Sequence, residues 1–122
     1  MRLVDYIVDM MSDRDAFGHD PQVQYMRRVF ARMEIAQKTL LARIGVEPLD
    51  ERLRNLREVT LGLFEKTWIT AMRKGIIENE EDAALLYLHC LHHTLLTSGI
   101  EAPSDAIPDN RKMQLFVKQV LS

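Results

Sequence analysis

The residues best suited to chemistry lie close together near position 90. Three of the four histidines and the only cysteine fall between positions 89 and 93. On a helix, His89 and His93 lie one turn apart and point the same way, so both rings could bind one metal ion. A structural zinc site needs four ligands, and the chain has no HExxH, CxxC or Glu-x-x-His pattern to supply the others. We therefore expect no metal and no other cofactor, with His89 and His93 as the candidate ligands should a metal bind.

The same segment resembles the histidine phosphotransfer domain over three residues. That domain is a helical bundle whose phosphorylated histidine lies in a pattern such as H-x-L-K-G, and His93, Thr94 and Leu95 match the first three positions. The resemblance implies phosphotransfer through His93. Leu96 and Thr97 replace the lysine and the glycine, which neutralise the phosphate and make room for it. The chain therefore lacks the residues that support this chemistry.

Nucleophilic catalysis by Cys90 is a third possibility. On a helix, Cys90 points about 100° away from His89 and lies among leucines. A thiol buried in apolar surroundings has a raised pKa and is inert. We interpret the whole segment as the end of a structural helix, with His92 and His93 at the negative end of the helix dipole. We expect His89 and His93 to mark its least buried side.

Start and stop signals predict the helices that position these residues. The signals are capping residues or prolines at the starts and glycines after the ends. The predicted long helices cover residues 21–44, a stretch from residue 48 or 50 to 74, and residues 79–97. Two shorter helices are predicted near the N-terminus and after Pro108. The fold class is thus all-α, an antiparallel bundle of about five helices in one domain over residues 1–122. The helix over 79–97 is the most apolar and should be central.

A basic face is the main candidate for nucleic-acid binding. Residues 21–74 hold eleven basic and six acidic groups, whereas residues 75–107 hold six acidic groups and no lysine or arginine. The candidate residues for contacting phosphates are Arg28, Arg32, Arg52, Arg54 and Arg57. Because acidic residues lie among them and the whole chain has a net charge of −2, we favour a solvated or ion-paired face over a nucleic-acid site.

A second apolar stripe is the main candidate for protein contact. Leu61, Trp68 and Met72 lie about 100° from the main stripe of their helix, and tryptophan is frequent among the residues that dominate interface energy. Gly62 costs about 1 kcal/mol relative to alanine in a helix interior, and the close approach of a neighbouring helix would be a reason for it. The stripe predicts a homodimer or a partner protein.

Composition excludes several classes of protein. The chain has 122 residues, 47% hydrophobic and 28% charged, which is typical of a globular domain. A single cysteine fits a reducing compartment, and no segment is long and apolar enough for a membrane span. We therefore expect a non-enzymatic cytoplasmic helical module, an adaptor or small regulator, that acts through protein–protein contact and self-associates. The alternatives are a small nucleic-acid-binding regulator and a histidine-dependent metal, cofactor or phosphotransfer module.

Overall fold

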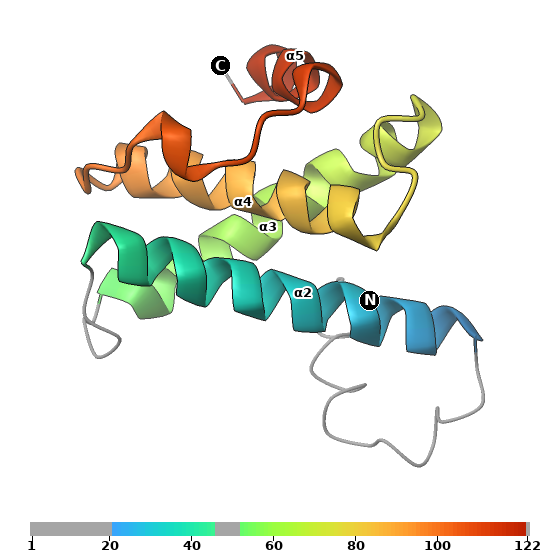
Figure 1. Cartoon of the computed structure of the whole chain (residues 1–122), viewed down its shortest axis with the longest axis horizontal. Coiled ribbons are helices and arrows are strands. Elements are labelled where there is room, and N and C mark those ends of the chain that lie inside the picture. The colour runs from blue at the N-terminus through green and yellow to red at the C-terminus, as the bar shows by residue number, and fades with distance from the viewer. Residues whose placement is uncertain (1–20, 46–51, 122) are drawn as a thin grey trace.

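The computed structural model describes residues 21–45 and 52–121. Over these residues the chain is all-α, as predicted (Figure 1). The elements are α2 (Pro21–Ile44), α3 (Arg52–Arg73), α4 (Glu80–Thr97), the short 3-10 helix η1 (Ser104–Ala106) and α5 (Arg111–Val120). The helix predicted near the N-terminus and the predicted start of the second long helix lie outside the described residues. No helix in the described part has the length and apolar content needed to cross a membrane.

The helix ends follow the local signals in the sequence. Asn79 is the N-cap of α4, and its side chain accepts a hydrogen bond from the backbone N–H of Asp82 at 2.9 Å. Asn110 caps α5 in the same way. Gly75 and Gly99 follow the ends of α3 and α4 with φ of +69° and +79°, a left-handed conformation that favours glycine. These ends depend only on residues a few positions apart, so they were predictable.

Helix α4 is the hub of the fold, as predicted. It packs against α2, α3 and α5, and α5 lies on the opposite side of α4 from α2 (Figure 1). Helices α2 and α3 run in roughly opposite directions along the molecule (Figure 1). These two helices contact each other little and meet mainly through α4, and α3 passes behind α4 in the view of Figure 1.

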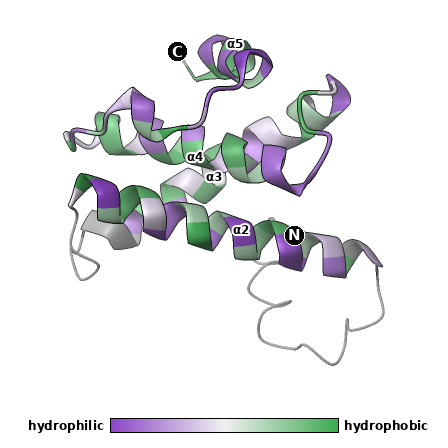
Figure 2. Cartoon of the chain, in the orientation of Figure 1, coloured by the Kyte–Doolittle hydropathy of each residue, from purple (hydrophilic) through white to green (hydrophobic). Residues whose placement is uncertain are grey.

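The buried side chains form two apolar clusters along α4. The larger one surrounds Phe64 and Leu86, which are fully buried, and the smaller one surrounds Leu95 near the end of α4. Phe64 stacks with Trp68 and makes an edge-on contact with Tyr87, each at 6.1 Å between ring centroids. Figure 2 shows hydrophobic and hydrophilic residues alternating along α2 and α5, the pattern of amphipathic helices that bury one face.

The packing around Gly62 does not require a glycine at this position. A Cβ atom added to it would meet no heavy atom within 4 Å. The expectation that a neighbouring helix approaches closely at this position is therefore wrong. The described part of the chain offers no structural reason for a glycine there.

Candidate interaction surface

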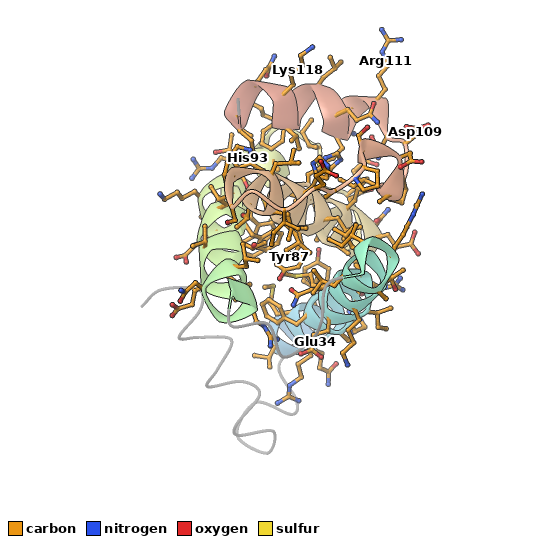
Figure 3. The ribbon with its side chains drawn as sticks, turned by 90° about the vertical axis from the view of Figure 1, so that its left-hand side faces the viewer. Glu34, Tyr87, His93, Asp109, Arg111 and Lys118 are labelled. Atoms are coloured by element: carbon orange, nitrogen blue, oxygen red, sulfur yellow. The ribbon has the colours of Figure 1, made fainter. Side chains whose placement is uncertain are left out.

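The histidine segment lies on α4, but its rings do not converge. The described residues hold no group of three or more His, Cys, Asp or Glu side chains placed to bind a metal ion. The Nε2 atom of His92 is 2.8 Å from the carbonyl oxygen of Ala102, so this ring holds the segment after α4 against the helix. His93 is half-buried and lies on the side of α4 that faces α5 (Figure 3).

His89 is half-buried, like His93, so the two residues lie on the least buried side of α4, as predicted. The Nε2 atom of His89 is nevertheless buried and has no hydrogen-bond partner among the described residues. Burial and, secondarily, the nearby His92 lower the pKa of His89 to about 4. His89 lies one turn before His93 on α4 and therefore shares its side of the helix.

Cys90 is buried inside the core, as expected. Its Sγ atom lies 3.9 Å from the hydroxyl of Thr67, and burial raises the pKa of the thiol to about 12. A thiol with that pKa carries almost no thiolate at neutral pH and is a poor nucleophile.

The described arginines of the predicted basic face form ion pairs between helices. Arg28 and Arg32 on α2 both bond the carboxylate of Glu80, and Arg32 also reaches Glu81 at 3.3 Å. The Arg28 guanidinium is the largest cause of the lowered pKa of Glu80. These acids begin α4, where negative charge also suits the helix dipole. The basic stretch and the acidic stretch of the sequence thus neutralise each other within one fold.

Further pairs follow the same pattern. Arg57 on α3 bonds Glu34 on α2 at 3.0 Å, and Arg43 bonds Asp105 at 3.3 Å. Arg52 and Arg54 lie in the first turn of α3, and the contacts of their side chains lie outside what the structure describes. The described arginines of the predicted face therefore form ion pairs with carboxylates of the same chain. These pairs leave little positive charge for binding a phosphate backbone.

The residues of the predicted stripe, Leu61, Trp68 and Met72, differ in how far they are buried. Leu61 and Trp68 are partly buried against the larger core cluster, whereas Met72 is 46% exposed. The indole Nε1 of Trp68 is buried without a hydrogen-bond partner in the described part of the chain. Most of the stripe therefore packs against the core, and only Met72 lies on the free surface.

A small cavity lies between α2, α3 and α4 beside Tyr87. The Tyr87 hydroxyl donates to Gln37, and burial raises the pKa of Tyr87 to about 12. Figure 3 shows Tyr87 in the space between these three helices. The cavity has a volume of about 40 Å³, whereas ligand pockets usually enclose about 300–1,000 Å³. It has room for water but not for a metabolite.

A larger groove opens to solvent between α2, α4 and the turn before α5. Its volume is about 460 Å³. Its apolar lining comes from two helices and consists of Ile35, Ala36, Ala84, Leu85 and Leu88. Its polar lining consists of Arg32, Glu81, Asp82, Asp109 and Asn110, with Pro108 beside them. Three acids against one arginine give these residues a net negative charge.

Ile35 is the most informative residue of this groove. Its side chain is 66% exposed, although its type favours burial. Sequence reasoning missed the groove, because the main stripe of residues 21–44 passes on the other side of the helix. The one available signal was Ile35 itself, an apolar residue among polar ones about 180° from Met26.

Comparisons of the chain with protein-family models, with curated proteins and with solved structures find no match. The geometry of this chain therefore carries the functional argument alone.

Proposed function

We propose that the chain is a non-enzymatic helical module, an adaptor or small regulator of the cytoplasm, that acts through protein–protein contact and self-associates. The groove between α2 and α4 is the observation that carries this proposal. An apolar floor with a polar rim is the usual anatomy of a protein interface. The exposed Ile35 at its edge would gain the most from being covered, since burying such a side chain contributes about 1.5–3 kcal/mol.

The interior of the protein supports a role without catalysis. Cys90, a candidate nucleophile, is buried, and so is the Nε2 atom of His89, a candidate base. Their pKa values keep both groups neutral near pH 7. The cavity beside Tyr87 is too small to admit a substrate. Contact through the outer surface is the mode of action that these features favour.

The ion pairs favour a protein partner over a nucleic acid. Arg28, Arg32 and Arg57 already bond carboxylates of α2 or α4. Binding to a phosphate backbone would require these bonds to be exchanged for new ones, which removes most of the electrostatic gain.

Light scattering of purified protein tests this proposal. The chain has a mass of 14.2 kDa, and we expect twice that mass at about 100 µM, in the range where a modest interface still holds two copies together. Ile35→Glu places a charge on the apolar edge of the groove and should return the mass to that of one chain.

Val59→Glu is the matched control, because Val59 is 53% exposed on α3 and does not line the groove. This variant should keep the doubled mass. A single-chain mass for the unmodified protein would overturn self-association. A doubled mass that survives Ile35→Glu but not Val59→Glu would overturn the groove as the contact surface.

A further inference from the structure

The outer face of α5 carries an exposed leucine between two cations. Arg111, Leu115 and Lys118 are spaced by four and three residues and therefore share one side of the helix. Leu115 is 55% exposed, and neither cation forms an ion pair within the described part of the chain. Figure 3 shows Arg111 and Lys118 on the side of α5 that points away from α4. The opposite side holds Met113 and Phe116, which are buried in the core.

This face is complementary to the groove in both chemistry and charge. The groove offers Ile35, Leu85 and Leu88 as apolar partners for one large aliphatic side chain. Its rim offers Asp109 and Glu81, both exposed, as partners for the two cations. Glu81 also bonds Arg32 of its own chain, so it would share its carboxylate between that arginine and a cation of α5. Helix α5 itself has three basic residues and no acidic one. An amphipathic helix entering a groove through spaced anchors is a common mode of protein recognition.

We propose that the occupant of the groove is the outer face of α5 from a second copy of this chain, and that the two copies exchange this contact reciprocally. This inference rests on the proposed function, since it names the partner of the same groove. Leu115 is the anchor, and Arg111 and Lys118 pair with the acidic rim.

The position of α5 favours exchange between two copies over contact within one. The outer face of α5 points away from its own α4 (Figure 3), so it cannot turn into its own groove without leaving the core. Asp109 and Asn110 line the groove and lead directly into α5. Groove and occupant thus adjoin each other on one molecule, and a two-fold axis beside them would form both contacts at once.

Reciprocity also enlarges the contact. Helix α5 has ten residues and is about 15 Å long, so one contact would be small beside the roughly 800 Å² per partner of a stable complex. Two symmetric contacts double the buried surface without a new sequence element.

A charge-exchange experiment tests the pairing. The first variant carries Arg111→Glu and Lys118→Glu, which makes its α5 face acidic. The second carries Glu81→Lys and Asp109→Lys, which makes its groove rim basic. Like charges meet in each homodimer, whereas every contact in the mixed dimer joins opposite charges. We expect each variant alone to have the mass of one chain, and the equimolar mixture to regain the doubled mass, as measured by light scattering and native mass spectrometry.

A single substitution tests the anchor. Leu115→Glu should raise the dissociation constant of the dimer roughly tenfold or more, as expected for an anchor residue at the centre of an interface. Leu96→Glu is its matched control, because Leu96 is 50% exposed on α4 and lies outside the groove.

The outcomes separate this inference from the proposed function. A dimer that dissociates with Ile35→Glu but resists Leu115→Glu would overturn α5 as the occupant and leave the groove as the contact surface. A charge-exchanged mixture that forms no mixed dimer, although each variant is folded by circular dichroism, would also overturn the pairing. A single-chain mass for the unmodified protein would overturn the proposed function and this inference together.

Discussion

Replacing His89 by leucine should stabilise the protein, although it alters the hub helix. The Nε2 atom of His89 is buried without a partner in the described structure, and a buried unsatisfied polar atom costs about 1–3 kcal/mol. Leucine has a similar size and no polar atom to desolvate. We therefore expect His89→Leu to raise the free energy of unfolding by about 1 kcal/mol at neutral pH.

The stabilisation by His89→Leu, relative to the unmodified protein, should grow at acidic pH. The pKa of His89 is about 4 in the fold, against an ordinary value of 6.5. Between these two pH values the unfolded chain binds a proton at His89 that the folded chain does not bind. The free energy of unfolding therefore falls as the pH drops from 6.5 toward 4, and no such loss occurs above pH 6.5. The loss is at most about 1.4 kcal/mol for each pH unit. Down to pH 5 this amounts to about 2 kcal/mol, and the remaining exposure of the ring reduces it to about 1–2 kcal/mol.

Urea unfolding at about pH 7.5 and pH 5 measures both effects. The difference in unfolding free energy between His89→Leu and the unmodified protein should be larger at the lower pH. His92→Leu is the matched control, because it removes the bond to Ala102 and should destabilise by about 1 kcal/mol. If His89→Leu is less stable at both pH values and its pH dependence equals that of the unmodified protein, the burial argument for His89 is refuted.

Three other substitutions or measurements follow from the packing. Phe64→Ala should lower the free energy of unfolding by about 3–5 kcal/mol in urea unfolding, because the ring is fully buried; a loss below 1 kcal/mol would contradict its place in the core. Gly62→Ala should raise the unfolding free energy by about 1 kcal/mol, because the added methyl meets nothing within 4 Å, and destabilisation would reveal a contact there. Cys90 should react with a thiol reagent only as fast as the protein opens, because burial raises its pKa to about 12; rapid labelling of the folded protein would refute its burial.

The fold brings the basic and acidic stretches of the sequence together, so that their charges pair. Arg28 and Glu80 are separated by 52 positions and form a direct bond. Such exposed pairs contribute little to stability, but they decide which surfaces still carry free charge. The α5 face, with Arg111 and Lys118 unpaired among the described residues, is one surface where positive charge remains available, and this would not follow from counting charges along the chain.

The sequence by itself determined the helices and most of their ends. Asn79 and Gly99 bound α4 as predicted, because capping needs only a side chain and backbone groups three or four positions apart. The buried stripe of α2 was also predictable, since apolar spacing identifies the face that a helix hides. The all-α class and the central place of α4 follow from these local patterns and from its apolar content.

Only the tertiary structure decided what covers each remaining face. Spacing placed His89 on one side of α4 but could not say that α5 would pack against this hub helix. Likewise, spacing set Ile35 apart from its stripe but could not place Asp109 beside it in one groove. Crossing angles and neighbours depend on how the side chains of two helices interdigitate, which no single segment encodes. For this reason the candidate interaction surface appears only when α2, α4 and the turn before α5 come together.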